Sequence, residues 1–409
     1  MFLSSARQAL VALFVAVLVS ACGGSGGSAP PPAGGVTVTP GDGKVTVSWN
    51  VAPGVKYWLF YAPSSSITTT DWINVPGSRA LMDVTSPYVL SGMVNGVTYS
   101  FSVNGRTGDG AGGPGTPSVS VVPRPAGGTW SAPASLGSNT LRSITYGTSS
   151  ADSLGYYLAL GDAGSAFKST DGLNFAALAP ASTNNLNASI YTLGKFVAVG
   201  SGGTIRYGTD LAAWTSATSG TTQALNAIAS NGTLAVTVGN GGTALRSTDG
   251  VAWTPVTLPT TQNLYGVTYS GAGIWVAVGA GGTVLTSTDG ATWVAVASGT
   301  TADLNSVAVQ AASSYVYVAA GNNGTIVRST DNGITWAAQA SATTANLLAV
   351  SPTSSQFLAT GTGGSVVTSP DGITWTARSS GTTASLNAVI SGFAQYVAVG
   401  QSGITINSQ

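Results

Sequence analysis

Apolar residues return along the second half of the chain in short runs that each end in glycine. Residues 275–279, which read Trp-Val-Ala-Val-Gly, are one such run. The seven terminal glycines are Gly161, Gly200, Gly239, Gly279, Gly321, Gly361 and Gly400, and successive glycines lie 39, 39, 40, 42, 40 and 39 residues apart. A nearly continuous apolar run is typical of a strand covered on both faces, and a period near 40 residues suits a β-propeller blade of four short strands. We therefore predict seven such blades over residues 129–409.

The last blade predicts how the ring closes. Its first three strands begin at Leu386, at Tyr396 and near Ser402, and the chain then ends at Gln409 where a fourth strand is due. Residues 127–130 read Gly-Gly-Thr-Trp, which matches the missing piece. We expect the start of the domain to supply this strand, a split-blade closure that leaves no open sheet edge.

Residues 36–123 alternate between apolar and polar positions instead, as in residues 44–49, Lys-Val-Thr-Val-Ser-Trp. Alternation with regular turns predicts a β-sandwich. Residues 90–103, with Tyr99, resemble the corner between two strands of a fibronectin type III domain, and Trp49 matches its core aromatic. The resemblance implies an all-β chain in which this domain is a spacer before the propeller, with residues 124–128 as the linker.

A polar turn follows the third strand of six blades. In one copy, residues 247–253 read Ser-Thr-Asp-Gly-Val-Ala-Trp. We name these the aspartate turns, after Asp171, Asp210, Asp249, Asp289, Asp331 and Asp371. They resemble the Asp-box, or BNR repeat, of sialidases and of photosystem II stability/assembly factor-like propellers. Because every such blade repeats the carboxylate, we expect it to accept hydrogen bonds from turn amides and to serve the fold.

Composition narrows the chemistry. The chain has 13 basic and 13 acidic residues, no His, and no Glu. The balance of charge argues against a nucleic-acid partner, and without His the commonest general base and metal ligand are missing. We expect no catalytic residue, no metal and no cofactor. A glycoside hydrolase is the third and least favoured alternative, because catalysis of the sialidase kind would require a Glu, and the chain has none.

The N-terminus predicts export. Residues 1–21 hold Arg7 and an apolar stretch too short to span a membrane, typical of a signal peptide. Small residues precede Cys22, the single Cys, and this arrangement resembles a bacterial lipobox, which implies lipidation of Cys22. A flexible Gly/Ser/Pro tether is expected over residues 22–35. The absence of Asp after Cys22 favours, by resemblance to sorting rules, the outer membrane over the inner one.

The residue after the first Leu of each blade is a candidate for binding. We name these seven positions the axial ring: Arg142, Asn187, Asn226, Tyr265, Asn305, Leu348 and Asn387. They are expected to face the propeller axis, where a peptide loop or a glycan could bind. The alternative is that the asparagines join neighbouring blades by bonding to backbone, in which case Arg142 and Tyr265, which break the pattern, are the better binding candidates.

A second candidate is the basic column, which precedes the Ser of the aspartate turns. It consists of Lys168, Arg206, Arg246 and Arg328. It could bind acidic groups of a partner, or its members could be solvated strand ends. From both patterns we expect a monomeric, non-enzymatic lipoprotein of the bacterial cell envelope whose propeller binds or helps to assemble other proteins. A glycan-binding propeller is the alternative.

Overall fold

The computed structural model describes residues 27–124, 127–311, 314–353, 355–392 and 395–408, and the chain separates into two compact units, residues 1–125 and 126–409. The signal peptide and Cys22 lie outside the described residues. Within the described part, no helix is long and apolar enough to cross a membrane.

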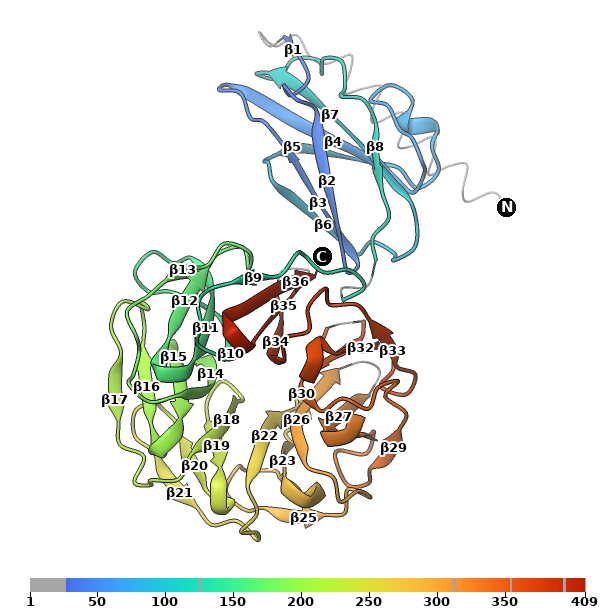
Figure 1. Ribbon diagram of the computed structural model, residues 1–409. Helices are drawn as coiled ribbons and strands as arrows, with labels where there is room; N and C mark the ends of the chain where they lie inside the picture. The colour runs from blue at the N-terminus through green and yellow to red at the C-terminus, as the bar shows by residue number, and fades with distance from the viewer. Residues whose placement is uncertain (1–26, 125–126, 312–313, 354, 393–394, 409) are drawn as a thin grey trace. The chain divides into compact units, whose positions relative to one another are not determined.

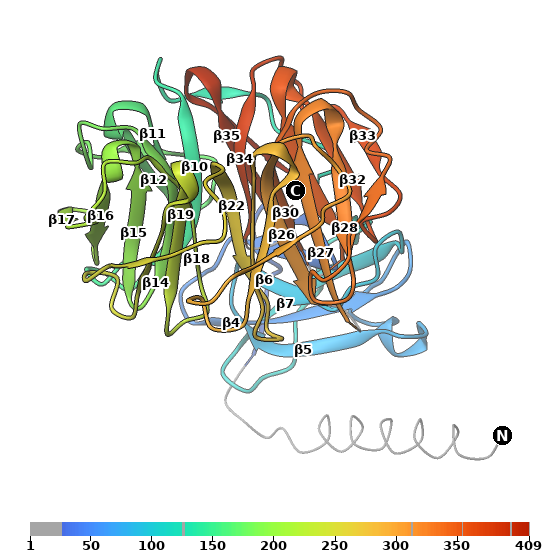
Figure 2. The ribbon, with the colours of Figure 1, turned by 90° about the horizontal axis from the view of Figure 1, so that it is seen from below.

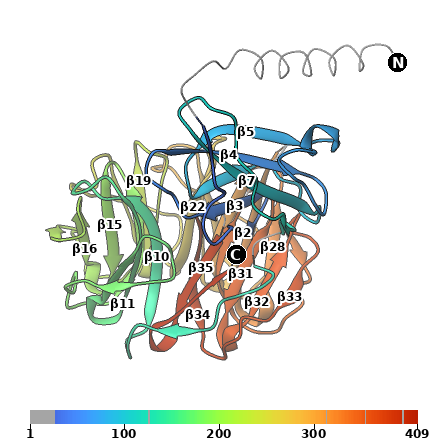
Figure 3. The same ribbon diagram turned by 90° about the horizontal axis from the view of Figure 1, so that it is seen from above.

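The first unit is a sandwich of two antiparallel sheets, one ordered β1-β7-β4-β5 with β8 also paired to β7, and the other ordered β2-β3-β6. Figure 3 shows the neighbouring strands β4, β5 and β7. The elements are β1 (Ser28–Ala29), β2 (Val36–Gly41), β3 (Lys44–Trp49), β4 (Val55–Ala62), η1 (Trp72–Asn74), β5 (Arg79–Val84), β6 (Tyr88–Ser91), β7 (Tyr99–Thr107) and β8 (Val119–Val121).

The core of the sandwich forms because alternate residues of both sheets point inward. Trp49, Tyr57 and Phe101 are buried in it. The hydroxyl of Tyr99 accepts a hydrogen bond from the Val94 amide at 3.2 Å, which fixes the turn before β7 as the fibronectin resemblance implies.

The structure corrects the predicted tether. Ser28 and Ala29 pair with Arg106 and Gly105 of β7, and Ala29 is buried. Gly27 makes two hydrogen bonds with Thr107: its carbonyl accepts from the Thr107 amide, and its amide donates to the side-chain Oγ1 of Thr107. The end of the expected tether is therefore held to the sandwich, because the edge of β7 offers unpaired backbone groups that the segment satisfies.

The second unit contains seven antiparallel four-stranded sheets in its described residues. Sheet 1 is β10 (Leu141–Thr148), β11 (Gly155–Gly161), β12 (Ala166–Ser169) and β13 (Ala176–Ala177); sheet 2 is β14 (Leu186–Thr192), β15 (Lys195–Gly200), β16 (Ile205–Gly208) and β17 (Thr215–Ala217); sheet 3 is β18 (Leu225–Ser230), β19 (Ala235–Gly239), β20 (Ala244–Ser247) and β21 (Thr254–Val256). Sheet 4 is β22 (Leu264–Tyr269), β23 (Trp275–Gly279), β24 (Val284–Ser287) and β25 (Val294–Val296); sheet 5 is β26 (Leu304–Ala311), β27 (Tyr315–Gly321), β28 (Ile326–Ser329) and β29 (Ala337–Gln339); sheet 6 is β30 (Leu347–Pro352), β31 (Phe357–Gly361), β32 (Val366–Ser369) and β33 (Thr376–Arg378). Sheet 7 is β34 (Leu386–Gly392), β35 (Gln395–Gly400), β36 (Ile404–Ser408) and β9 (Ala134–Ser135).

A short 3-10 turn follows the second strand of every sheet. These turns are η2 (Asp162–Gly164), η3 (Ser201–Gly203), η4 (Asn240–Gly242), η5 (Ala280–Gly282), η6 (Asn322–Gly324), η7 (Thr362–Gly364) and η8 (Gln401–Gly403). The last glycine of η4, Gly242, has φ +68°, and a Cβ there would lie 2.0 Å from the carbonyl oxygen of Thr260. Only glycine fits such a site.

The sheets are arranged around a central axis, as Figure 1 shows for this unit. The first strand of each sheet is innermost and contacts the first strand of the next, and β34 contacts β10, so the ring is closed. Figure 2 shows β22, β26 and β30 side by side. The second strands are buried on both faces, as the apolar runs predict: residues 196–200 and 396–400 are buried throughout.

Sheet 7 is completed from the start of the unit. Ala134 and Ser135 of β9 pair with Thr405 and Ile404 of β36 (Figure 1). An isolated bridge joins Trp130 to Ser408. The Leu136 amide donates to the carbonyl of Gly403 at 2.9 Å. The split blade is thus observed and the strand edge of β36 is covered, but the pairing strand lies at Ala134–Ser135, after the predicted residues 127–130, of which Trp130 contributes an isolated bridge.

Candidate functional site

The axial ring is built by a bulge that every inner strand repeats. In sheet 3, Leu225 pairs with Gly239 and Ala227 pairs with Val238, so the pairing skips Asn226. The same shift occurs after Leu141, Leu186, Leu264, Leu304, Leu347 and Leu386. All seven Leu are 0% exposed. A buried Leu therefore anchors each strand end, and the bulge redirects the next side chain out of the ladder.

The seven redirected side chains meet at one place. Arg142, Asn187, Asn226, Tyr265, Asn305, Leu348 and Asn387, with Asn185 and Ser201, line a cavity of about 460 Å³, which we name the axial cavity. Each ring residue is partly buried. All seven sheets thus contribute to one concave site, and its volume lies in the range of ligand pockets.

The asparagines of the ring join neighbouring sheets. Nδ2 of Asn226 donates to the carbonyl of Leu264 at 2.9 Å, from sheet 3 to sheet 4. Asn187, Asn305 and Asn387 donate in the same way to the carbonyls of Leu225, Leu347 and Leu141 at 3.0, 2.8 and 2.9 Å. The bond from Asn387 to Leu141 crosses the closure of the ring. Of the two readings of these asparagines, the structure shows the bonding to backbone, and it also leaves them lining the cavity.

Three ring positions depart from this pattern. Arg142 Nε donates to the Asp162 carboxylate, forming an ion pair at 2.5 Å between partly exposed side chains. Tyr265 and Leu348 have no hydrogen-bonding role among the described residues. The sequence prediction missed Asp162. A signal was available, because the residue after each repeated glycine is polar in six of seven sheets: Asp162, Ser201, Asn240, Asn322, Thr362 and Gln401, with Ala280 as the exception.

The aspartate turns lie away from the axial ring and are locally satisfied. Oδ1 of Asp249 accepts hydrogen bonds from the amides of Val251 and Ala252, both at 2.8 Å, and from Ser247 Oγ at 2.9 Å. The turns of Asp171, Asp289, Asp331 and Asp371 repeat this arrangement. Within the described residues, Asp210 accepts hydrogen bonds from the amides of Ala212 and Ala213 alone, because Gly208 replaces the Ser.

In the five turns that keep the Ser, these hydrogen bonds lower the pKa of the Asp carboxyl group. Donation by the backbone amides of Thr292 and Ala291 lowers the pKa of Asp289 to about 2. At Asp171, burial by itself would raise the pKa, but hydrogen bonds from Asn174, Leu173 and Ser169 outweigh it and bring the pKa to about 2. A carboxylate held ionised by its own turn is a poor proton donor or acceptor near neutral pH, which fits a structural role.

The members of the basic column make separate local contacts. Lys168 lies 4.6 Å from the ring centre of Tyr156. Arg206 donates to Ser216 in its own sheet, and Arg328 Nε donates to the carbonyl of Asp371 in sheet 6 at 3.0 Å. Arg246 is exposed. Three of the four charges thus have local partners on three different sheets.

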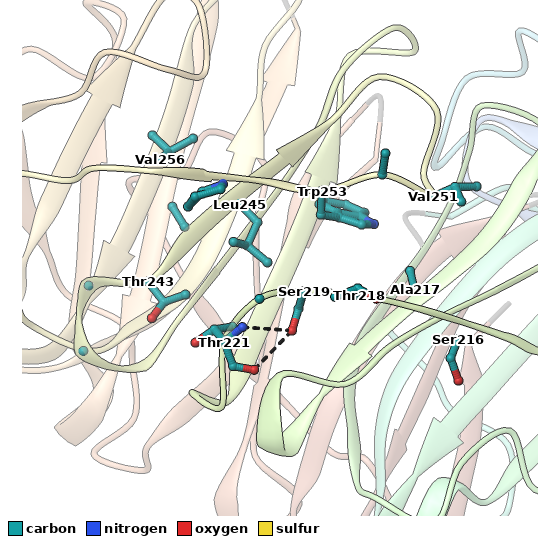
Figure 4. Close-up of a pocket in the computed structure, with 16 residues that line it drawn as sticks. Ser216, Ala217, Thr218, Ser219, Thr221, Thr243, Leu245, Val251, Trp253 and Val256 are labelled. Carbon is teal, nitrogen blue, oxygen red and sulfur yellow. Dashed lines mark hydrogen bonds between the residues drawn. The ribbon is translucent and has the colours of Figure 1, made fainter.

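A groove between sheets 2 and 3 is a further candidate. It has a volume of about 790 Å³ and is lined by residues 216–221, 241–245, 251–253, 255 and 256 (Figure 4). Ser219 Oγ donates to the carbonyl and accepts from the amide of Thr221 on its wall. Related hollows of about 650 and 850 Å³ lie beside the loops that contain Ser298 and Ser380.

Among the described residues, no group of three or more Cys or Asp side chains could hold a metal ion. Asp303, near the axial ring, is engaged by the Gly281 amide at 2.8 Å.

Comparison with known families identifies both units. Residues 29–121 match the fibronectin type III domain, and residues 274–393 match the DUF6242 beta propeller domain. No curated protein matches the chain.

Solved structures agree with the second assignment. A structure of YCF48 bound to D1 peptide has a TM-score of 0.55 and 18% sequence identity, with 68% of this chain and 94% of that chain covered. YCF48 from Cyanidioschyzon merolae has a TM-score of 0.54 and 17% identity, covering 68% and 98%. The WD40 repeats of RRP9 have a TM-score of 0.55 and 9% identity, covering 68% and 99%. At these identities the likeness concerns the fold. The chain is thus a fibronectin type III domain followed by a β-propeller.

Proposed function

We propose that the propeller is a non-enzymatic module that binds a segment of another protein at the axial cavity. The observation that carries the proposal is the convergence of seven bulged side chains on one cavity, where Arg142 and Tyr265 depart from the inter-sheet bonding. The structure of YCF48 bound to D1 peptide supports it, as a similar propeller that binds a polypeptide.

We also propose that the protein is exported and anchored by a lipid. The signal-like residues 1–21 and the lipobox-like residues before Cys22 support export and lipid anchoring in a bacterial cell envelope, with the outer membrane preferred. The partner would then be an envelope protein, and the propeller would act as a monomer in binding or assembling it.

Capture of partners from intact envelopes tests the binding face. Tyr265→Ala should reduce capture by the full chain about tenfold or more. Arg142→Ala, which removes the one formal charge of the lining and leaves Asp162 unpaired, should change capture at least several-fold. Both should leave the unfolding midpoint nearly unchanged, because the ion pair of Arg142 is partly exposed and Tyr265 joins no sheets. The matched control is Arg206→Ser with Arg246→Ser in the basic column. Capture that survives the cavity variants but is lost with the control variants, or with added salt, would reject the axial cavity.

Glycan binding is the second candidate, favoured by the groove between sheets 2 and 3. Its Ser, Thr and Gly lining and the related hollows near Ser298 and Ser380 suit several weak sites for hydroxylated ligands. A glycan array followed by titration tests it. More than one site per chain, and weaker binding by Thr218→Trp, which would fill one groove, are the expected results for a lectin.

A further inference from the structure

The asparagines of the axial ring have a fixed orientation. A main-chain carbonyl oxygen only accepts hydrogen bonds, so the atom that faces Leu225, Leu264, Leu347 or Leu141 must be the amide nitrogen Nδ2. The carboxamide oxygen Oδ1 of each asparagine therefore lies on the other side of its amide group.

Two asparagines of the ring use both of their amide hydrogens within the protein, whereas Asn187 and Asn387 each donate one hydrogen bond. Nδ2 of Asn226 donates a second hydrogen bond to Oδ1 of Asn240 at 2.8 Å, and Nδ2 of Asn305 donates one to Oδ1 of Asn322 at 2.9 Å. Both amide hydrogens of these two side chains are thereby engaged.

The acceptors of the ring are free. Within the part of the chain that the structure describes, no residue donates a hydrogen bond to Oδ1 of Asn187, Asn226, Asn305 or Asn387. All four side chains line the axial cavity. Four carbonyl oxygens that carry partial negative charge and have no donor within the described residues thus belong to side chains of the cavity wall, and none of them is a fully buried atom.

The one formal positive charge in the lining is offset. Arg142 pairs with the carboxylate of Asp162, which lies outside the lining, and this neighbouring negative charge offsets the charge of Arg142. Tyr265 adds an aromatic ring, whose face attracts cations. An anionic group would face four carbonyl dipoles of unfavourable sign, whereas an ammonium or guanidinium group would meet acceptors that have no other donor.

We propose that the axial cavity selects a cationic N–H donor, namely a Lys or Arg side chain of the polypeptide partner. The inference rests on the proposed function and names the chemistry that the cavity recognises. The cavity of about 460 Å³ holds one long side chain, with its charged end among the Asn oxygens and its methylene groups near Leu348 and Tyr265.

Three labelled pentapeptides test the selectivity with the full chain. Acetyl-Gly-Ser-Lys-Ser-Gly-amide is compared with the same peptide carrying Gln or Glu at the centre, and binding is followed by fluorescence anisotropy. The Lys peptide should bind about tenfold more tightly than the Gln peptide, because its hydrogen bonds are charge-assisted, and the Glu peptide should bind most weakly. Equal affinities, or a preference for Glu, would overturn the inference.

A gain of affinity provides the sharper test. Leu348→Asn supplies a fifth acceptor at a position where four other sheets already carry Asn, and it should tighten the Lys peptide several-fold. Asn226→Leu removes one acceptor and should weaken it several-fold, with the unfolding midpoint measured in parallel. The matched control is Leu154→Asn, which adds an Asn at a side chain 52% exposed and outside the cavity and should change nothing. Unchanged affinity in Leu348→Asn and Asn226→Leu would also overturn the inference.

The two proposals fail in different ways. If the three peptides bind equally and Tyr265→Ala weakens all of them, the proposed binding at the cavity stands and the selectivity for cations is wrong. If no peptide binds while Arg142→Ala still reduces capture of the envelope partner, binding at the cavity again stands and the selectivity for cations is again wrong. If glycans bind and neither peptides nor partner capture respond to cavity variants, both proposals are wrong.

Discussion

At the residue scale, one dipeptide of each blade does two jobs. The Leu is fully buried and fixes the start of the inner strand. The next residue, placed on a bulge, lines the cavity; the four asparagines also join two sheets, and Arg142 pairs with Asp162. The sequence was sufficient to predict which seven residues share the ring. It could not predict the direction of the amide groups, because the acceptor carbonyl lies 38 positions away from Asn226 in the next sheet. The pairing of Arg142 with Asp162 was missed for the same reason, since the two meet only after β10 and β11 pair.

The inter-sheet bonds should contribute measurably to stability. Asn226→Ala removes the donor to Leu264 and should lower the free energy of unfolding by about 1 to 2 kcal/mol. Leu348→Asn places a donor near the carbonyl of Leu386 and should raise it by about 0.5 to 1 kcal/mol. Urea denaturation checks both. An Asn226→Ala variant with an unchanged free energy of unfolding would show that these bonds do not hold the sheets together.

At the scale of elements, the aspartate turns and strand β9 are the two features that the sequence predicted in most detail. The turns could be predicted because all their partners lie within a few residues, as for Asp249 with Val251 and Ala252. The degree of burial of the Trp side chains could not be predicted from the sequence. Trp253 is 8% exposed, whereas Trp130 is only partly buried, since Trp130 lies on an isolated bridge at the edge of sheet 7.

The turns predict sensitivity to acid. The pKa of Asp171, Asp289 and Asp331 is about 2 in the folded protein, below the value near 3.9 of an unfolded chain. A lowered folded pKa gives stability that is complete above the unfolded pKa and is lost as the pH falls toward the folded pKa. The thermal midpoint should therefore fall between about pH 4 and pH 2. Asp289→Asn should lower the midpoint at pH 7 and make the fall with acid smaller. A midpoint that is flat over this range would contradict the role of these hydrogen bonds.

The closure of the ring by β9 and β36 should contribute to the stability of the propeller. Trp130 packs against the buried cluster that contains Tyr396 and Leu386. Because Trp130 is only partly buried, Trp130→Ala should lower the free energy of unfolding by about 2 kcal/mol. Deleting residues 404–409 removes β36, the partner of both β35 and β9, and should abolish cooperative unfolding of the propeller. A Trp130→Ala variant that melts like the parent protein would show that the bridge to Ser408 does not stabilise the closure.

At the scale of the whole molecule, repetition made the fold predictable from one sequence. The glycine period located every sheet, and the unmatched last repeat located the split blade. Alternation in residues 36–123 located the sandwich, but it gave no sign that Ser28 and Ala29 join its sheet, because a two-residue strand has no pattern to detect.

The proposed anchor has consequences for the whole molecule. With Ser28 held to β7, only the five residues 23–27 separate Cys22 from the sandwich, so the lipid and the domain would be at most about 20 Å apart. Cys22→Ala should move the protein from the membrane fraction to the soluble fraction and abolish labelling by a fatty-acid probe. Unchanged fractionation, with no labelling of the parent protein, would refute lipidation.

The central claim, binding of a protein segment at the axial cavity, is tested most directly by site-specific photocrosslinking in intact cells. A photoreactive benzoyl-phenylalanine replaces Leu348 in the cavity, Thr218 in the groove or Arg246 in the basic column, three sites on different parts of the propeller. We expect a discrete protein adduct from position 348, lost when Tyr265→Ala is added, and no such adduct from positions 218 and 246. Adducts from position 218 or 246 with none from position 348 would contradict the account.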